Sequence, residues 1–307
     1  MKTSIIIPAY NARDTIYKTL DSIKIQKNIS SFEVVIVRDT GEVYDDIVNE
    51  YKKFYNIKTI DMPENGGPGL ARQYGIDNTD SEYIVFIDAD DYFYDENSLF
   101  NLMDGIKNAD LGVGNFRYER DDEVTIKQKN FVWLHGKIYR RQFLLDNNIR
   151  FNDTRANEDN GFNRLILFHE PNIAFIDKLV YVYSENSNSI TRKDNRLYKF
   201  TGLEWYAYNM NWAIKEAEKR NLDMKLVFET SLGVLVAMYF YYLDLYELYD
   251  VSYILKWSKE LKNTFTKYFN KYGSVKMIDY FVEEKKKEYD DKEINYLLNF
   301  YEFLQKI

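Results

Sequence analysis

The chain has no cysteine and only two histidines, His135 and His169, among its 307 residues. The first absence excludes disulfides and thiolate metal sites, and the second excludes a zinc site built from several histidines. Proline is also scarce, with four residues and none after Pro171. The long proline-free stretch that follows is compatible with helices, because proline interrupts them.

Long apolar runs are missing as well. The longest, Leu232 to Leu243, is too short to span a bilayer and is rich in tyrosine. The N-terminal residues lack the apolar core and cleavage site of a signal peptide, so we expect a cytoplasmic protein, with peripheral contact at the inner membrane face left open. A formal charge of −8 argues against general nucleic-acid binding, which needs a basic surface.

The first half of the chain alternates apolar strands with amphipathic helices. We expect strands over Ser4–Ile7, Glu33–Val37, Ile57–Met62, Tyr83–Asp88 and Leu111–Phe116, and helices from about Asp14, over Val43–Phe54, from about Leu70 and over Ser98–Ala109. This rhythm predicts an α/β fold with a mostly parallel, Rossmann-like sheet and helices on both faces.

After Phe116 the rhythm loosens. We expect short helices over 140–147 and Glu158–Phe168, a strand over Ile173–Tyr183, and almost only helices from about Leu197. The change of pattern predicts a boundary near Asn195, between an α/β domain of residues 1–195 and a helical region of residues 196–307. Acceptor binding, oligomerisation and capping are the roles open to that region.

The most informative motif is Asp88-Ala89-Asp90, followed by Asp91. It comes directly after an apolar run typical of a buried parallel strand, so its carboxylates should lie at the sheet edge where α/β folds bind ligands. A divalent cation bridging to a phosphate would neutralise them there. Taken alone, so short a pattern is more simply a solvated turn.

Other polar loops should lie at the same edge. Pro8-Ala9-Tyr10-Asn11 ends the first strand, and Asp39 ends the second. Asp39 is equally suited to accept hydrogen bonds from a base or ribose and to begin an Asp-Thr-Gly turn. The glycine-rich segment from Asn65 to Arg72 exposes backbone amides to an anion. It matches neither a Walker loop nor a Rossmann fingerprint.

A second acidic pair, Glu158-Asp159, opens a helix. From position alone, the simpler interpretation is that these acids complement the helix dipole, and the alternative is that Asp159 is a general base. The simpler interpretation of His135 is a structural histidine, and the alternative is a metal ligand. For Arg192, a solvated cation and a partner for a diphosphate are equally good interpretations.

Together and in this order, the motifs resemble the family 2 glycosyltransferases of GT-A fold. The resemblance covers roughly residues 3–192 and favours the functional interpretations of Asp90 and Asp159. The matching segments are Ser4–Asn11, Asp39, Asn65-Gly66-Gly67 with Ala71-Arg72, Ile87–Asp91, Gly136–Arg140, Ile149–Phe151 with Glu158-Asp159, and Ser189–Arg192.

The resemblance implies an inverting, metal-dependent enzyme. It would transfer glucose, galactose or an N-acetylhexosamine from a UDP-sugar to a hydroxyl of a glycan, a polymer or a lipid-linked acceptor, with Mn²⁺ or Mg²⁺. Asp159 would be the catalytic base, and Asp90 would bind the metal. His135, which the resemblance does not assign, is a further candidate for the metal shell or for contact with the acceptor. The residues implied in donor binding are Pro8, Ala9, Tyr10, Asn11, Asp39, Asn65, Arg72, Asp88, Ala89, Glu158 and Arg192.

Two positions depart from the family pattern, and both bear on base preference. Arg38 precedes Asp39 where many members carry a second aspartate, and Gln73 follows Arg72 where asparagine is commoner. A homo-oligomer formed through the C-terminal helices is a further expectation. The sequence fixes neither the sugar nor the acceptor.

Rival functions remain open at this point. A non-catalytic nucleotide-sugar or glycan binder with the same fold would bind without turnover. A nucleotidyltransferase would need a glycine-rich, basic loop where Pro8–Asn11 stands. A phosphatase with an Asp-x-Asp nucleophile would carry it after the first strand, whereas here it follows the fourth.

Overall fold

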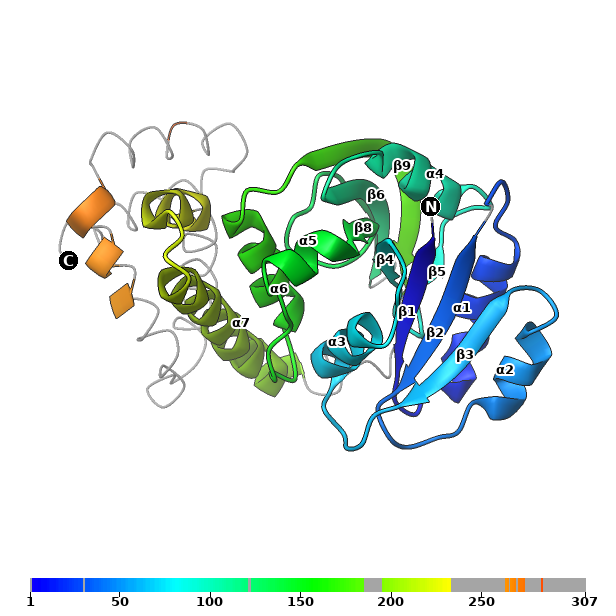
Figure 1. The fold of residues 1–307 in the computed structure, drawn as a ribbon. Coiled ribbons are helices and arrows are strands. Elements are labelled where there is room, and N and C mark those ends of the chain that lie inside the picture. Colours follow the sequence, from blue (N-terminus) through cyan, green and yellow to red (C-terminus); the bar gives the residue numbers. More distant parts are fainter. Residues whose placement is uncertain are drawn as a thin grey trace. The chain divides into compact units, whose positions relative to one another are not determined.

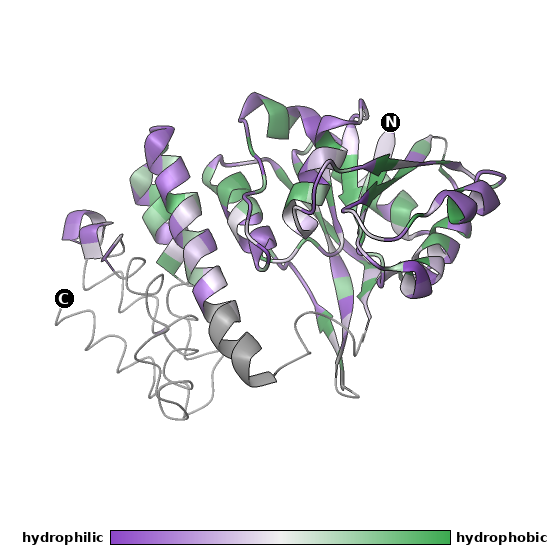
Figure 2. Ribbon diagram, turned by 90° about the horizontal axis from the view of Figure 1, so that it is seen from below, coloured by the Kyte–Doolittle hydropathy of each residue, from purple (hydrophilic) through white to green (hydrophobic). Residues whose placement is uncertain are grey.

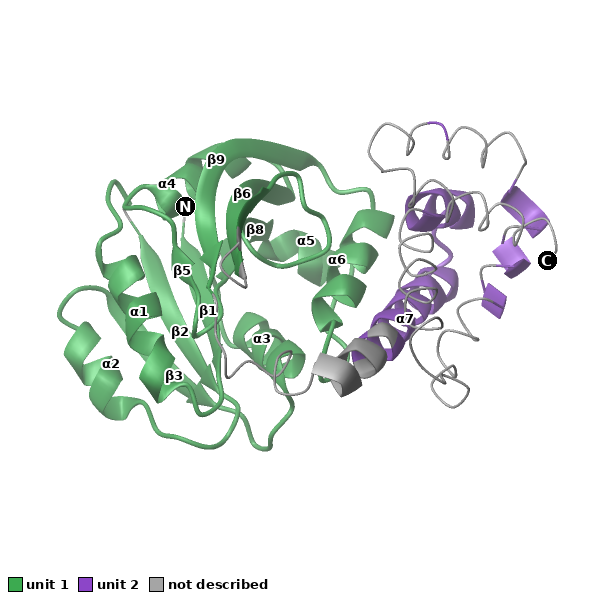
Figure 3. Cartoon of the chain, turned by 180° about the vertical axis from the view of Figure 1, so that it is seen from behind, with its two compact units in different colours: residues 1–190 green, residues 191–307 purple. Residues whose placement is uncertain are grey.

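The structure is a computed structural model, and it describes residues 2–29, 31–120, 123–184 and 195–232, with 263–264, 266–268, 270–273 and 283 further on. The chain divides into two compact units, residues 1–190 and 191–307 (Figure 3). Within the described residues, no helix has both the length and the apolar character needed to cross a membrane.

The first unit is built on a nine-stranded sheet (Figure 1). Its first four strands are parallel, in the order β3-β2-β1-β4: β1 (Thr3–Ala9), β2 (Phe32–Arg38), β3 (Asn56–Asp61) and β4 (Tyr83–Phe86). Ile5 of β1 pairs with Val34 of β2 and with Val85 of β4, and all three are buried. Their near-continuous apolar sequence reflects a sheet covered on both faces.

Beyond β4 the sheet is mixed. Its strands are β5 (Tyr92–Phe93), β6 (Leu111–Arg120), β7 (Glu123–Lys127), β8 (Lys137–Arg140) and β9 (Ile173–Tyr183). β8 runs antiparallel to β4 and β6, β9 runs parallel to β6, and β5 and β7 are antiparallel additions. The expected parallel sheet is therefore confirmed for the first four strands, whereas the second half combines antiparallel pairs with the parallel pair β6–β9. The sequence did not predict β5, β7 and β8.

Helices cover both faces, as expected (Figure 1). α1 (Arg13–Lys24), α2 (Asp45–Tyr51) and α4 (Ser98–Ile106) supply residues to one core with the strands. α3 (Pro68–Asp77), α5 (Arg141–Asp146) and α6 (Glu158–Phe168) lie on the opposite side, where Phe162 of α6 packs 6.3 Å from Phe86 between ring centroids. Each of these helices carries both hydrophobic and hydrophilic residues (Figure 2), as expected where one side of a helix is buried and the other faces solvent.

The helix expected over Val43–Phe54 is shorter, and both of those end residues lie outside it. Val43 and Phe54 are 53% and 45% exposed, whereas the helix buries its own apolar face. The residues that face the core are Tyr44, Ile47, Val48 and Tyr51, which recur at helical spacing. Tyr44 also binds the neighbouring loop, since its hydroxyl accepts the Ala12 amide at 3.0 Å.

The second unit begins with a long helix, α7 (Asn195–Lys219), and residues 224–232 are helical as well. Ala207, Met210, Ala213 and Ile214 are buried along α7, and the helical character expected from about Leu197 is confirmed over this element. The role of this region, including oligomerisation, stays a prediction. Arg192 and the aromatic run 239–242 lie outside the described residues.

Candidate active site

Asp39 fastens the glycine-rich loop. Its two carboxylate oxygens accept the amides of Gly66 at 2.6 Å and Gly67 at 2.7 Å, and the Asn65 side chain donates to it at 3.2 Å. Gly67 has φ of +83°, a conformation that a residue with a side chain rarely adopts. Asp39 therefore holds the loop after β3, a contact that neither interpretation of its sequence anticipated, and its direct contact with a base stays a prediction.

The loops after β1 and β2 pack against each other at this edge. The Asp39 amide donates to the Ala9 carbonyl at 2.9 Å. A Cβ on Gly41 would lie 2.5 Å from Asn11 Oδ1, so only glycine fits there. Tyr10 lies beside this packing, with its ring edge next to Gly41, and is 56% exposed. The structure therefore brings Pro8–Asn11 and Asp39 together, as predicted.

Arg155 adds a contact that the sequence did not indicate. Its guanidinium donates to the Asn65 carbonyl at 3.0 Å and also to the Asn65 side chain. A residue three positions ahead of Glu158 therefore holds the loop that begins the glycine-rich segment. The loop of the second acidic pair and the loop after β3 are joined directly.

Arg72 connects the two acidic motifs. Its guanidinium nitrogens lie 2.6 Å from Asp88 Oδ1 and 2.6 Å from Glu158 Oε1, and the residue is 5% exposed. Burial opposes ionisation of Asp88, but the charge of Arg72 and contact with His135 outweigh it and hold the pKa of Asp88 well below its ordinary range. The predicted donor-binding residues Arg72, Asp88 and Glu158 thus form one ionic chain, in which Arg72 and Glu158 are buried and Asp88 is partly exposed.

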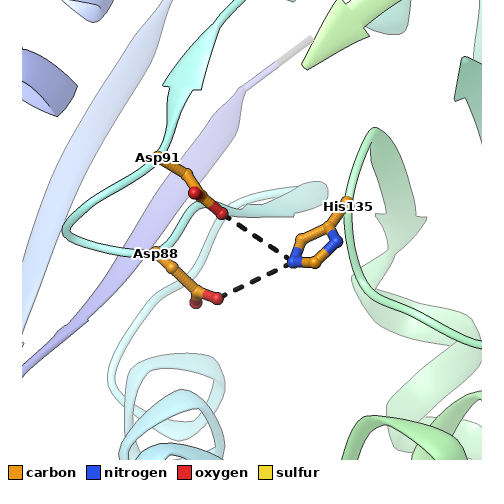
Figure 4. A group of neighbouring side chains, drawn as sticks. All are labelled: Asp88, Asp91 and His135. Atoms are coloured by element: carbon orange, nitrogen blue, oxygen red, sulfur yellow. Dashed lines mark ion pairs between the residues drawn. The ribbon is translucent and has the colours of Figure 1, made fainter. Parts of the chain in front are cut away.

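Asp88, Asp91 and His135 form a candidate cation site (Figure 4). Their potential ligand atoms all lie within 4.8 Å of one another, and His135 Nε2 is 3.8 Å from an oxygen of each aspartate. Burial lowers the pKa of His135, which favours the neutral imidazole that a metal needs. Two carboxylates and an imidazole nitrogen fit Mn²⁺, and carboxylates alone would serve Mg²⁺.

The sequence assigned the metal to Asp90, which does not belong to this group. Asp91 belongs to it instead, and it is also held by the Tyr181 hydroxyl at 2.6 Å and the Ser184 amide at 2.8 Å. Burial raises the pKa of Asp91, and the charges of Asp90 and Asp88 add to the effect. The direct role of Asp90 stays a prediction, while His135 lies where a second ligand was expected.

Asp159 occupies the first turn of α6. Burial, followed by the charge of Glu158, raises the pKa of Asp159 to about 7, and the charge of Arg72 opposes the shift. One of its carboxylate oxygens accepts the Asn160 amide at 2.9 Å. A carboxyl group that ionises near neutral pH has the protonation behaviour of a general base.

Lys137, at the start of β8, is a buried cation. The sequence indicated it only as part of the matching segment Gly136–Arg140. It is 1% exposed, and its ammonium group donates to the Trp133 carbonyl. Burial lowers the pKa of Lys137 to about 7, although attraction to Asp159 works against the shift. Only the tertiary structure reveals this proximity, because 22 residues separate the two positions along the chain.

The helix that carries Asp159 is firmly anchored. Asn163, four residues on, accepts the Tyr139 hydroxyl at 2.9 Å and donates to the Val132 carbonyl at 2.8 Å. Phe162 stacks on Phe151 with ring centroids 3.9 Å apart. These contacts fix α6 against β8 and the loop that precedes it.

Comparisons with known proteins agree with this geometry. Residues 4–156 match the family model of Glycosyl transferase family 2. The chain is 30% identical over 205 residues to the poly(ribitol-phosphate) β-N-acetylglucosaminyltransferase TarS of Staphylococcus aureus, and 33% identical over 183 residues to a poly(ribitol-phosphate) β-glucosyltransferase of Bacillus spizizenii. These matches cover 60% and 53% of this chain, but only 35% and 29% of the relatives.

Solved structures establish the fold. S. aureus TarS 1–349 in complex with UDP-GlcNAc has a TM-score of 0.69 at 21% identity, covering 91% of this chain and 83% of that chain. Mannosyltransferase PcManGT of Pyrobaculum calidifontis, in complex with GDP-Man and Mn²⁺, has a TM-score of 0.57 at 14% identity, covering 96% and 84%. The chain therefore belongs to glycosyl transferase family 2, and the fold that carries its candidate active site is GT-A.

Proposed function

We propose that the chain transfers a sugar from a UDP-sugar to a hydroxyl of a glycan or cell-surface polymer, with inversion and metal assistance. The sugar would be glucose, galactose or an N-acetylhexosamine. The observation that carries the proposal is the ionic chain Asp88–Arg72–Glu158, which connects the acidic motif after β4 to the turn that presents Asp159.

The nucleotide would lie over the loops after β1, β2 and β3. The backbone there is fixed by Asp39 and Arg155, and Tyr10 is exposed beside it. TarS has been solved with UDP and with UDP-GlcNAc, which supports a uridine nucleotide as the first donor to test. The names of two relatives of this chain, both poly(ribitol-phosphate) glycosyltransferases, support a cell-wall polymer among the candidate acceptors.

Asp88, Asp91 and His135 would hold Mn²⁺ or Mg²⁺, with Asp90 next to them as a further candidate ligand. When bound, the cation would stabilise the negative charge that develops on the leaving diphosphate. Arg72 keeps Asp88 ionised and therefore ready for a cation. The ionic pair with Arg72 also fixes the orientation of that carboxylate.

Asp159 would take the proton of the acceptor hydroxyl. As the acceptor oxygen attacks the anomeric carbon, the new carbon–oxygen bond forms, the bond from that carbon to the diphosphate breaks, and the proton passes to the Asp159 carboxylate. Attack on the face opposite the leaving group inverts the anomeric centre without a covalent intermediate. The pKa of about 7 suits this proton transfer at neutral pH.

The test is UDP release from a panel of UDP-sugars with Mn²⁺ and no acceptor. We expect slow hydrolysis of one donor that EDTA abolishes and that Asp88→Asn greatly reduces. Asp104→Asn is the matched control, because Asp104 is exposed on α4, away from the acidic motif. UDP binding without release from any donor would instead support the rival non-catalytic binder, and the absence of binding would contradict both.

A further inference from the structure

We propose that Tyr118, Trp133 and Tyr183 form a subsite that stacks a neutral pyranose ring of the acceptor. This set of three side chains is termed the aromatic platform. The inference rests on the glycosyltransferase function proposed above and adds the chemical class of the acceptor. The three rings come from β6, from the loop before β8 and from β9.

The platform consists of three partly exposed rings, with Tyr118 stacked on both of the others. Tyr118 stacks on Trp133 with centroids 5.6 Å apart and planes 25° apart, and on Tyr183 at 5.2 Å and 15°. These separations are those of offset stacks, in which neighbouring rings overlap only in part. All three residues keep intermediate exposure, so some ring surface remains accessible to a ligand.

Buried rings hold the platform in place. Phe116, which is fully buried, lies 5.6 Å from Trp133 between centroids, and the His135 ring lies 4.9 Å from Tyr183. Tyr118 and Tyr183 are direct neighbours on the parallel strands β6 and β9. Rings already held in position lose little conformational entropy when a ligand stacks on them.

Strand order places the platform on the acceptor side of the site. The sheet runs from β2, which is followed by Asp39, through β1, β4 and β8 to β6 and β9. The acidic motif after β4 therefore lies between the proposed nucleotide loops and the strands of the platform. A donor that reaches from Asp39 to Asp88 leaves the far side for the acceptor.

The platform is also joined to the proposed base. The Trp133 carbonyl accepts the Lys137 ammonium group, whose charge is attracted to Asp159. The neighbouring Val132 carbonyl is held at 2.8 Å by Asn163 of the Asp159 helix. The loop that carries the Trp133 ring is thereby held against the helix that carries Asp159.

The chemistry of the surface favours a neutral sugar ring. Aromatic faces match the C–H face of a pyranose, whereas a linear polyol phosphate has no ring to stack and carries negative charge. Without a bound cation, Asp88 and Asp91 would repel that charge, since His135 connects them to the platform; with the cation bound their charge is balanced, and selection rests on the ring faces. The Lys127 ammonium group lies 5.7 Å from the Tyr118 centroid and offers one compensating cation.

The first test is direct binding, which requires no turnover. Trp133 is the one tryptophan among residues 1–190, and Trp205, Trp212 and Trp257 lie beyond them. Methyl β-glucoside and methyl β-N-acetylglucosaminide are titrated into the full chain with UDP and Mn²⁺, and tryptophan fluorescence is followed. We expect a saturable change at millimolar concentration that is lost in Trp133→Phe. No saturable change, or one that persists in Trp133→Phe, would overturn the platform while leaving the proposed function standing.

The second test is kinetic. Trp133→Ala is expected to raise the KM for a pyranoside acceptor at least about tenfold and the KM for the UDP-sugar by less than about twofold. Trp133→Phe should recover most of the loss. Phe175→Ala is the matched control, because Phe175 is 53% exposed on β9 and is not part of the platform.

Two kinetic outcomes would contradict the inference. One is an equal rise in both KM values, which would make Trp133 a structural residue. The other is efficient transfer to poly(ribitol phosphate) that Trp133→Ala leaves unchanged, which would identify a polyol phosphate as the acceptor. If the wild type transfers to no acceptor at all, the proposed function fails, and the fluorescence titration still decides on the platform.

Discussion

The nucleotide side and the reaction side of the candidate site are stabilised in opposite ways. On the nucleotide side, the charge of Asp39 is stabilised by backbone amides, and its hydrogen bonds connect the loop after β2 to the loop after β3. On the reaction side, Arg72, Lys137 and Asp159 bring buried or half-buried charges together, and the pKa values of Lys137 and Asp159 are both shifted to about 7. The hydrogen bonds of the first region are complete without a ligand. In the second region, burying charges costs folding free energy, and the same burial shifts pKa values towards those that acid–base chemistry needs.

The largest expected effect is on the reaction side. Asp159→Asn removes the proposed proton acceptor and should lower the rate of transfer by about 10²–10⁴-fold. UDP affinity, measured by calorimetry, should stay near the wild-type value, since the nucleotide loops are untouched. Asp153→Asn is the matched control, because Asp153 is exposed in the preceding loop. Near-normal transfer by Asp159→Asn would refute the assignment of the base.

Loss of the buried guanidinium should come next. Arg72→Ala leaves Asp88 and Glu158 without their shared cation, and we expect a loss of about 3–5 kcal/mol in the free energy of unfolding. Arg150→Ala is the control, because its pair with Asp77 is largely exposed and should be worth about 1 kcal/mol or less. Urea unfolding followed by circular dichroism measures both. Equal losses in the two variants would show that the Asp88–Arg72–Glu158 chain contributes no more to the free energy of unfolding than an exposed ion pair does.

A smaller effect is expected on the nucleotide side. Asp39→Asn replaces one accepting oxygen by an amide that cannot accept the Gly66 or Gly67 N–H, which should cost about 1–3 kcal/mol. The dissociation constant for UDP should rise accordingly. Asp61→Asn is the control, because Asp61 pairs with Arg38 at the surface. If UDP binds Asp39→Asn as well as wild type, the loop does not depend on this carboxylate.

The smallest effect is the pH dependence of stability. Because the pKa of Asp159 is raised in the folded state, its contribution is fully favourable below the unfolded value of about 4 and is lost as pH rises through about 7. Asp159→Asn should therefore be more stable than wild type at about pH 8, by about 1 kcal/mol or ~2–4 °C in Tm. The difference should shrink towards about pH 5. A difference independent of pH would contradict the raised pKa.

Sequence reasoning succeeded where local pattern decides structure. β1, β2 and β4 are mostly apolar because both of their faces are buried, whereas β3, at the edge of the sheet, buries only Ile57. The four strands run parallel, so their polar ends meet at one edge as expected. β7 was missed because its apolar residues Val124 and Ile126 are exposed, and β5 was missed because it has only two residues.

The contacts that define the reaction side join residues far apart in the sequence, and a local sequence pattern does not predict them. Arg72 and Glu158 lie 86 residues apart along the chain, and Asp91 and Tyr181 lie 90 apart. Their pairing depends on how the mixed half of the sheet returns to the parallel half. For that reason the sequence indicated Asp90 as the metal ligand, whereas folding places Asp91 beside Asp88 and His135.

The central claim is that Asp159 is a base tuned by its surroundings. The most direct measurement is the pH dependence of kcat/KM for transfer between about pH 5 and about pH 9 at saturating Mn²⁺. The account predicts that the rate rises with pH to a plateau, with a midpoint near 7, and that the residual rate of Asp159→Asn lacks this rise. A flat wild-type profile, or an identical rise in Asp159→Asn, would contradict it.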